Sequence, residues 1–342
     1  MDLIYMNSSK EEIGVMMNYE LDLAFGEDEN DFECRIASNA HCCEPDYYLY
    51  IEGTEYGGII DEIEVDTNDN EVIYGGRTWH GILESKVIVP LKSGEASTSN
   101  VTVKTKDASG ASLVDRYLVI SGDANACIGF ILNRIGLSDL FTASSKTAGV
   151  SISAFQFDRY IDAYAGIIKM LDNVKMRMHL EYQDNKVVVS AVKQYDYATD
   201  EEFDSELVDL RMKKRFNTVN HLLCLGKGEL ENRMIVHLYA DESGNISQTQ
   251  TQFGMNERME IYDYSAVESE EELVAQGIER LKTLWEPDEM TINLDDTSDF
   301  YNVGDKVGAT DNITKVTVSA KIKKKIVNIN NGQITISYEV GE

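Results

Sequence analysis

The residues of this chain that could do chemistry stand closest together in the stretch LLCLGKGELENRMIVHLYAD, which covers residues 222–241. Lys227 and Glu229 alternate there with two glycines between two apolar runs. A phosphate-binding loop also needs a serine or threonine after the lysine, and it lies between a strand and a helix. No serine or threonine follows Lys227, and residues 234–239 have the pattern of a strand. The stretch therefore predicts a strand, a turn and a returning strand.

A second candidate is the stretch Asp66-Thr-Asn-Asp-Asn70, in which Asp66, Asn68 and Asn70 have the spacing of the first ligands of a calcium-binding loop. Such a loop requires glycine at position 6 and glutamate at position 12. Those positions hold Glu71 and Arg77 here. The backbone angles of a turn explain the Asn- and Asp-rich sequence, so we predict a turn and no calcium site.

His41, Cys42 and Cys43 could begin a zinc site, but a structural zinc ion takes four ligands. No second pair of cysteine or histidine stands at ligand spacing. The chain also lacks the Gly-x-Ser-x-Gly sequence that places a serine nucleophile. Its 60 carboxylates bring acid pairs together anywhere, so such a pair indicates no catalytic site by itself. We therefore expect no metal, no cofactor and no catalytic residue.

The composition indicates a soluble chain of two or three compact domains. It has 342 residues, of which 43% are apolar, and only three prolines. The five cysteines are odd in number and irregularly spaced, which favours reduced thiols over a disulfide framework. No apolar run is long enough to cross a bilayer, and residues 1–14 lack the pattern of a secretory signal. We expect the protein to be made and kept in a cytoplasm unless an assembly carries it out.

The charge is strongly negative, with a net value of −29 from 60 acidic and 31 basic residues. Proteins bind duplex DNA through basic residues, so this charge argues against nucleic-acid binding as the main function. The acidic excess lies in residues 1–95 and 201–342, whereas residues 96–200 are balanced. Two basic clusters occur at Arg211–Arg215 and Lys321–Lys325. We expect both to face acidic neighbours, within the chain or across a subunit contact.

Strands at both ends of the chain position these residues. Apolar alternation predicts N-terminal strands at residues 19–25, 31–37, 47–52, 58–65, 71–74 and 86–89. In the C-terminal region it predicts strands at residues 291–294, 316–322 and 334–340. The middle has helical spacing at residues 124–135 and 158–171. Ser269-Glu-Glu-Glu272 is a capping box that opens a further helix.

These patterns predict a mainly β fold with α+β insertions. We expect a first β-domain at residues 1–95, a smaller α/β domain at 96–200 and a second β-domain at 201–342. A helical insertion is expected inside the last of these at about residues 266–286. The two β-domains would thus flank the α/β middle.

Three stretches, in this order, resemble the tail hub proteins of phages and prophages. They are Tyr56-Gly-Gly-Ile-Ile-Asp-Glu-Ile63 with Tyr74-Gly-Gly-Arg-Thr-Trp-His-Gly-Ile-Leu-Glu-Ser-Lys-Val-Ile88, then Asn220–Arg233, then Tyr301-Asn-Val-Gly-Asp-Lys-Val307 with Ile336-Ser-Tyr-Glu-Val-Gly341. The family comprises the myophage baseplate hub and the N-terminal part of siphophage tail-associated proteins. The resemblance spans almost the whole chain.

The resemblance implies that both β-domains are tube-forming β-barrels and that the protein is a homotrimer. Three chains with two barrels each would form a pseudo-sixfold ring that joins a sixfold tail tube to a threefold tip. The implied partners are the tail tube or distal tail protein, the tape-measure protein and a tip or spike protein. The implied location is the tail tip of the virion, after assembly in the host cytoplasm.

The resemblance also bears on activity. Many relatives carry a C-terminal peptidoglycan hydrolase or receptor-binding extension, and this sequence ends at Glu342, soon after its last predicted strands. We therefore expect wall-degrading activity on another chain and interpret this one as a structural hub that is not an enzyme. We expect its acidic ends to line a channel, because a negative wall does not hold passing DNA.

Two alternative functions remain open. One is a cell-wall hydrolase that acts through paired carboxylates. The other is a glycan- or receptor-binding tail module in which Trp79, Tyr47, Tyr48 and Tyr50 stack on sugars, although aromatic residues at strand spacing are more often part of a core. Under the hub interpretation, the residues expected in subunit contacts or turns are Gly226, Lys227, Gly228, Glu229, Arg77 and Trp79.

Overall fold

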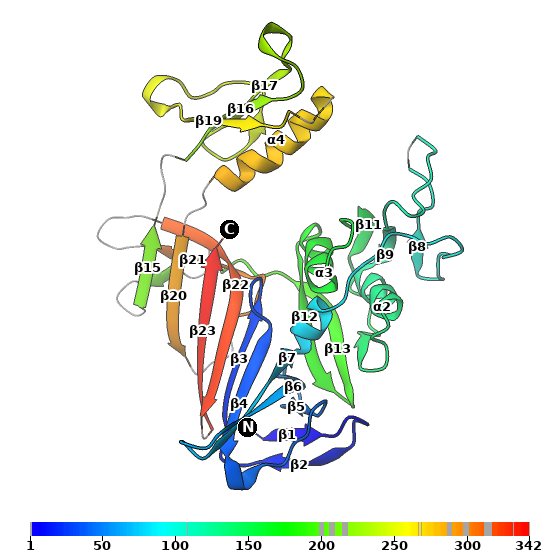
Figure 1. Ribbon diagram of the computed structural model, residues 1–342, viewed down its shortest axis with the longest axis vertical. Helices are drawn as coiled ribbons and strands as arrows, with labels where there is room; N and C mark the ends of the chain where they lie inside the picture. Colours follow the sequence, from blue (N-terminus) through cyan, green and yellow to red (C-terminus); the bar gives the residue numbers. More distant parts are fainter. Residues whose placement is uncertain are drawn as a thin grey trace. The chain divides into compact units, whose positions relative to one another are not determined.

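The computed structural model describes residues 2–107, 109–197, 202–204, 209–213, 218–265, 267, 269–285, 289–296, 301–310, 317–330 and 332–341. The chain divides into two compact units. Unit 1 contains residues 1–210 and 291–340, and unit 2 contains residues 211–290 with 341–342. The fold is mainly β with four helices among the described residues, which confirms the predicted fold class (Figure 1).

A large sheet is the main feature of unit 1. Its strands follow the order β15-β20-β23-β22-β3-β4-β7-β6-β5-β1-β2, and β21 pairs with β22 and with β14. The N-terminal strands are β1 (Leu3–Met6), β2 (Glu12–Met16), β3 (Glu20–Gly26), β4 (Asp31–Ala37), β5 (Tyr48–Tyr50), β6 (Gly57–Asp66) and β7 (Glu71–Thr78). The later strands are β14 (Glu202–Asp204), β15 (Asp209–Lys213), β20 (Glu289–Asp296), β21 (Lys306–Thr310), β22 (Thr317–Asn330) and β23 (Gln333–Gly341).

Strand β22 joins the two ends of the chain in this one sheet. It pairs with β21 up to Lys321 and then with β3, antiparallel, from Lys324 opposite Gly26 to Asn330 opposite Glu20. With 14 residues, β22 is long enough to hold both neighbours in succession. The sequence predicts a separate β-domain at each end. In the structure, the strands of both ends instead belong to a common sheet.

The alternation of residue types explains why β3 and β4 form a half-buried ribbon. Leu21 and Leu23 in β3 are buried together with Cys34 and Ile36 in β4. The residues that alternate with them, Asp22, Glu33 and Arg35, lie on the other face and are mainly acidic. Period-2 patterning of this kind buries one face of a sheet and exposes the other. One face of the sheet therefore belongs to the core, and the other is acidic.

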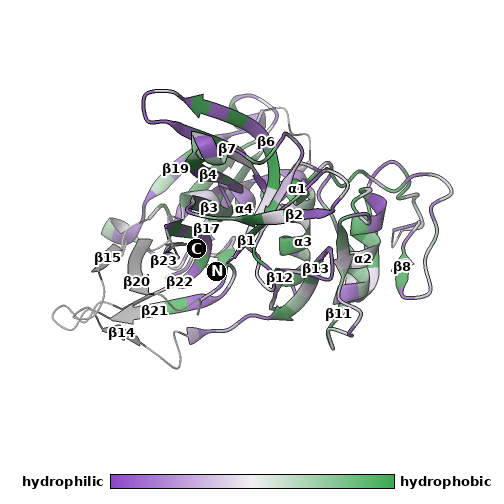
Figure 2. Cartoon of the chain, turned by 90° about the horizontal axis from the view of Figure 1, so that it is seen from below, coloured by the Kyte–Doolittle hydropathy of each residue, from purple (hydrophilic) through white to green (hydrophobic). Residues whose placement is uncertain are grey.

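Strands β6 and β7 form the predicted hairpin. The carboxylate of Asp66 accepts hydrogen bonds from the backbone amides of Asn68 and Asp69 at 2.7 and 3.3 Å, and Asn70 has φ = 56°. These are the features of an Asx turn, so the Asp66–Asn70 stretch closes a hairpin. Figure 2 shows hydrophilic and hydrophobic segments alternating along this hairpin.

The rest of unit 1 packs three helices and two small sheets into a continuous core. The helices are α1 (Trp79–Glu84), α2 (Ala124–Arg134) and α3 (Ala163–Asp172). The sheets follow the orders β10-β13-β12 and β11-β9-β8, with strands β8 (Val101–Val103), β9 (Val119–Asp123), β10 (Phe141–Ala143), β11 (Ser151–Gln156), β12 (Met176–Gln183) and β13 (Lys186–Lys193). Their apolar side chains form one buried cluster with Tyr50 and Trp79, so the core continues across the expected boundary near residue 95.

Unit 2 has its own sheet and its own core. Strands β16 (His221–Leu225), β17 (Ile235–Ala240), β18 (Ile246–Ser247) and β19 (Met259–Asp263) follow the order β18-β17-β16-β19, and α4 (Glu270–Leu284) packs on β16 and β17. Leu222, Cys224, Val236 and Leu238 are buried against Leu273 and other residues of this helix. The Ser269 hydroxyl accepts from the amide of Glu272 at 3.2 Å, as the capping box predicts.

Two expectations from the sequence need correction. The inserted part is not only a helix at about residues 266–286, because a four-stranded sheet of its own supplies the apolar face that α4 covers. Residues 86–89 form no strand and make only a single bridge, between Val87 and Asp162. No helix in the described parts of the chain has the length and apolar character needed to cross a membrane.

Candidate functional site: an acidic face of the large sheet

The outward face of the large sheet carries a row of acidic side chains. The strand registers place Asn328, Asp22, Glu33, Gly75 and Glu62 side by side on β22, β3, β4, β7 and β6. Two carboxylates, those of Asp22 and Glu33, are therefore directly opposite each other. Like charges in this position destabilise a sheet by up to about 1 kcal/mol. Their presence is not explained by the stability of the fold.

The row lies in a concave part of this face, with a cavity of about 620 Å³. Seven carboxylates line it: Asp22, Glu29, Asp31, Glu33, Asp61, Glu62 and Glu64. Among the described residues, no ion pair neutralises Asp22, Glu62 or Glu64. The concave face is therefore a surface of negative potential on which anions are repelled.

Burial and crowding act together on two of these carboxyls. The pKa of Asp22 is raised by partial burial and then by the nearby charges of Glu29, Glu33, Glu20 and Asp31. Partial burial also raises the pKa of Asp31. Burial and like charges both disfavour the charged form, which is the expected result when acidic side chains outnumber their basic partners in a concavity.

Gly75 and Gly76 of β7 lie in close contact with β6 at this acidic row. A Cβ atom on Gly75 would lie 2.8 Å from Oε1 of Glu62, and one on Gly76 would lie 1.9 Å from the carbonyl oxygen of Ile59. The pairing of β6 with β7 shifts register between Ile60 and Glu62 at this point. Glycine is therefore required at position 76, where the backbone of the irregular β6 approaches β7, whereas at position 75 the Glu62 side chain would have to move. This gives a physical reason for the Tyr-Gly-Gly-Arg part of the resemblance.

Arg77 and Trp79, which the sequence suggests for subunit contacts or turns, both have partners inside the chain. The Arg77 guanidinium donates two hydrogen bonds of 2.7 Å to the carboxylate of Asp61, and these bonds lower the pKa of Asp61. Trp79 is fully buried and stacks with Tyr182 at a centroid distance of 5.8 Å. In this structure Trp79 is a core residue, while 42% of the Arg77 side chain stays exposed.

The Gly226–Glu229 stretch lies in unit 2 and forms a turn. The amide of Gly226 donates to the carbonyl of Met234 at 2.9 Å, and the amide of Met234 donates to the carbonyl of Lys227 at 3.0 Å. Gly228 has φ = 114°, and a Cβ atom there would lie 2.3 Å from the carbonyl oxygen of Asn232. A short 3-10 turn and then β17 follow, with no helix. The predicted strand, turn and returning strand are present, but in unit 2 and not in a second barrel.

The residues considered for metal and sugar binding have other partners. The Tyr74 hydroxyl accepts from the amides of Cys42 and Cys43 and contacts Nδ1 of His41 at 2.9 Å. No group of three or more potential ligands suited to a metal ion occurs in the described part of the chain. Tyr50 is fully buried, as Trp79 is, so neither offers a ring to a sugar.

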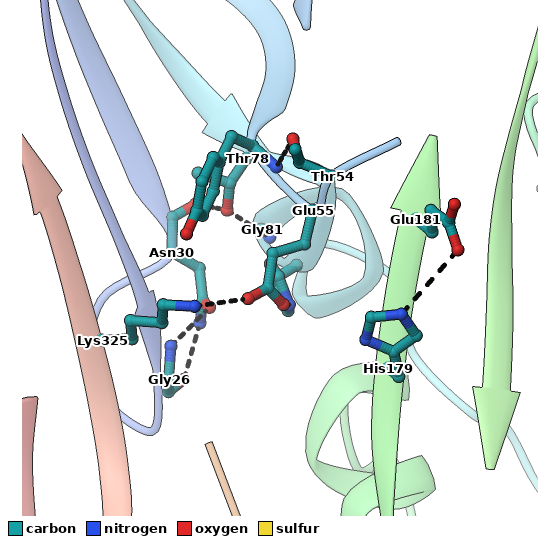
Figure 3. Close-up of polar contacts among 11 residues, drawn as sticks. Gly26, Asn30, Thr54, Glu55, Thr78, Gly81, His179, Glu181 and Lys325 are labelled. Atoms are coloured by element: carbon teal, nitrogen blue, oxygen red, sulfur yellow. Dashed lines mark hydrogen bonds and ion pairs between the residues drawn. The ribbon is translucent and has the colours of Figure 1, made fainter. Parts of the chain in front are cut away.

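A buried charged cluster under α1 is the feature that sequence reasoning missed. Lys325 of β22 is fully buried, and its ammonium lies 3.1 Å from a carboxylate oxygen of Glu55 (Figure 3). His80 lies beside them, with Nε2 at 3.8 Å from Glu55 and its ring stacked on Phe25 at 4.4 Å. Burial lowers the pKa of His80 to about 4. In the sequence, only the lysine run at residues 321–325 points to this cluster, and it does not identify which lysine is buried.

The other lysines of β22 also face acids of the same chain. Lys321 lies 2.6 Å from Asp172, and Lys323 lies 3.1 Å from Glu27. Lys324 contacts carboxylates on β23 and beside β3. The expectation that this basic cluster faces acidic neighbours is confirmed, and these neighbours lie within unit 1. The cluster Arg211–Arg215 has no described side chains.

Comparison with known proteins supports the resemblance at the level of the fold. No protein-family model matches the sequence, and no curated protein matches it. Solved structures do match it, and three of them, each at 10% identity, cover nearly the full length of both chains. A tail protein from Neisseria meningitidis MC58 has a TM-score of 0.52, with 100% of this chain and 96% of that chain covered. Prophage tail protein gp18 from Listeria monocytogenes EGD-e has a TM-score of 0.51, with 100% and 94% covered.

The 43 kDa tail protein of prophage MuSo2 from Shewanella oneidensis has a TM-score of 0.53, with 99% of this chain and 98% of that chain covered. All three matches run over nearly the full length of both chains, so they include the sheet of unit 1 and the inserted unit 2. At this level of identity, such matches establish a common fold and leave function to be argued separately. This chain therefore has the fold of phage and prophage tail proteins, in agreement with the resemblance in its sequence.

Proposed function

We propose that this chain is a structural hub of a phage or prophage tail. In this proposal three copies form a ring that joins the sixfold tail tube to the threefold tip and leaves a channel for DNA. The ring would contact a tail tube or distal tail protein, a tape-measure protein and a tip or spike protein. Support comes from the fold shared with tail proteins over the full chain length.

The acidic row on the concave sheet face is the observation that carries the channel part of the proposal. Glu33 of this row pairs with Arg35, whereas Asp22 and Glu62 have no ion-pair partner among the described residues. Carboxylates left without a basic partner are unfavourable for folding and do not bind nucleic acid. Such a row suits a wall along which DNA passes without adhesion. Screening limits such repulsion to about 8–10 Å at ordinary salt, so the face would have to form the wall itself.

Unit 2 supports the assembly part of the proposal. On the face of its sheet opposite α4, Ile235, Met259 and Ile261 are each more than half exposed, and His237 and Asp263 lie on the same face. Large exposed apolar patches rimmed by polar residues are typical of interaction surfaces. Such a face suits a contact with another chain of the tail.

The ring is tested by the mass of the protein in solution together with negative-stain images. We expect a trimer with a central opening, formed either by the chain alone or with the adjoining tail protein. A monomer with no ring in either condition would overturn the proposal. An assay on purified bacterial cell wall addresses the alternative of a hydrolase, for which we expect no release of fragments.

The channel is tested by exchanging Asp22, Glu33 and Glu62 for lysine together. The wild-type protein should not bind duplex DNA at low salt, whereas the triple variant should bind it with a strong salt dependence, because lysines release counterions from phosphates. The control exchanges Glu229, Glu242 and Glu271 of unit 2 for lysine, which changes the net charge equally. If both variants bound DNA equally well, the concave face would have no special role.

A further inference from the structure

Strand β2 forms one end of the large sheet and has an open edge. It pairs with β1, in a register that runs from Leu3 opposite Met16 to Met6 opposite Glu12, and no other described strand lies beside it. Another strand can add to such an edge through backbone hydrogen bonds. Natural proteins usually protect open edges with lysine or proline. The sequence of β2, Glu-Ile-Gly-Val-Met, contains neither.

A stripe of exposed apolar side chains follows the same strand. Ile13, Val15 and Met17 have exposed fractions of 51%, 47% and 71%. Ile13 and Val15 are two residues apart and share one face of β2, and Met17 follows directly after the strand ends at Met16. Val15 lies opposite Ile4, which packs against the core of unit 1. The stripe therefore extends the apolar surface of the core to the open end of the sheet, as expected of a contact that a neighbouring chain covers.

The other end of the described strand order is β15, and its sequence has the opposite charge. The strand reads Asp-Leu-Arg-Met-Lys, and the next two residues in the chain are also basic. Glu11 and Glu12, in contrast, stand at the start of β2. Charge complementarity favours contact between unlike ends and opposes contact between like ends. A contact between unlike ends is head-to-tail, and it produces a ring when its rotation closes.

We propose that β2 of one copy adds to the β15 end of the sheet in a second copy of this chain. Ile13, Val15 and Met17 then become buried between the subunits. This inference rests on the proposed ring function and names the contact that closes the ring.

The first test measures subunit association by sedimentation over a range of protein concentrations. Exchange of both Ile13 and Val15 for lysine should raise the dissociation constant about tenfold or more, because the new charges would be buried without partners. Val87→Lys is the matched control, since Val87 has a similar exposed fraction of 48% and makes its β-bridge with Asp162 and not with β2. It should leave association unchanged.

The second test uses disulfide formation between subunits. Val15→Cys combined with either Arg211→Cys or Met212→Cys should give covalently linked trimers under mild oxidation, and Val87→Cys combined with the same partners should not. A ring that persists in the lysine variant, or that gives no β2–β15 crosslink, overturns this contact and leaves the proposed hub function standing. A wild-type chain that stays monomeric with and without its tail partner overturns both.

Discussion

Asp61 and Asp22 lie on the same sheet, and their surroundings differ in a way that separates structure from function. Asp61 accepts two hydrogen bonds from the Arg77 guanidinium, which lower its pKa and join β6 to β7. Asp22 has burial and four acidic neighbours, which raise its pKa. Asp61 is thus neutralised by Arg77, whereas Asp22 is repelled by the carboxylates around it. The channel proposal gives a reason for an acidic residue at position 22 that the stability of the fold does not.

Protonation of His80 should contribute to the pH dependence of the free energy of unfolding. Burial lowers its pKa from 6.5 to about 4, so the folded protein keeps this ring neutral where the unfolded chain would protonate it. The unfolded state then binds more protons between those values, and stability falls as the pH is lowered from 6.5 to 4. The contribution of this one group to the loss is about 3 kcal/mol.

Urea unfolding at several pH values measures this contribution as a difference between variants. Between pH 6.5 and 4, the free energy of unfolding of His80→Gln should fall by about 3 kcal/mol less than that of the wild type. This difference does not depend on the stability of the variant at neutral pH. His41→Gln is the control, because His41 is exposed and is not among the groups that shift the pKa of His80, so it should leave the wild-type slope in place. Equal slopes in the wild type and His80→Gln would contradict the prediction.

At the scale of elements, lysines of the C-terminal strand β22 form ion pairs with acidic residues from earlier in the chain, and these lysines differ in burial. Lys325 is fully buried against Glu55, and Lys321 is 22% exposed against Asp172. Removing one partner of a buried pair leaves an uncompensated charge and costs about 3–5 kcal/mol. An exposed pair contributes about 1 kcal/mol at most. The two lysines should therefore respond very differently to the same exchange.

We expect Lys325→Met to lower the free energy of unfolding by about 3 kcal/mol and Lys321→Met by less than about 1 kcal/mol. Adding Glu55→Gln to Lys325→Met should restore part of the loss, because the buried carboxylate is then gone. Chemical denaturation of the three variants provides the measurement. Similar losses for Lys325→Met and Lys321→Met would mean that burial of the pair does not matter.

The same scale shows what could be predicted from sequence. The range 31–37 coincides with β4, and 124–135 differs from α2 by one residue, since local apolar spacing determines both. The pairing of β22 with β3 could not be predicted, because it joins segments about 300 residues apart and their spacing carries no record of the partner. The extent of unit 2 was missed for a similar reason. The sequence pattern of its strands resembles that of the large-sheet strands, and only the packing of α4 on them shows that they form a separate core.

The candidate site was predictable only in part. The acidic excess of the chain ends is plain in the composition, and it led to the channel hypothesis. The row formed by Asp22, Glu33 and Glu62 depends on register across separate strands, which composition does not contain. Trp79 was expected in a subunit contact or turn because it stands in a marker motif, yet its ring completes the core of unit 1.

At the scale of the whole molecule, two cores in one chain raise the question of whether they unfold together. Each unit has a separate buried cluster, and the sequence happens to place one tryptophan in each. Trp79 belongs to the core of unit 1, and Trp285 packs against the core of unit 2. Trp285→Phe therefore leaves a fluorescence probe of unit 1, and Trp79→Phe leaves a probe of unit 2.

Core substitutions should shift only the transition of their own unit. Leu281 of α4 and Leu132 of α2 are both almost fully buried, so exchange for alanine costs about 2–5 kcal/mol in either place. We expect Leu281→Ala to lower the denaturation midpoint seen by Trp285 and to leave that of Trp79 unchanged, with the reverse for Leu132→Ala. If each substitution moved both probes equally, the units would fold as one cooperative body, and unit 2 could not act as a separate contact module on the proposed ring.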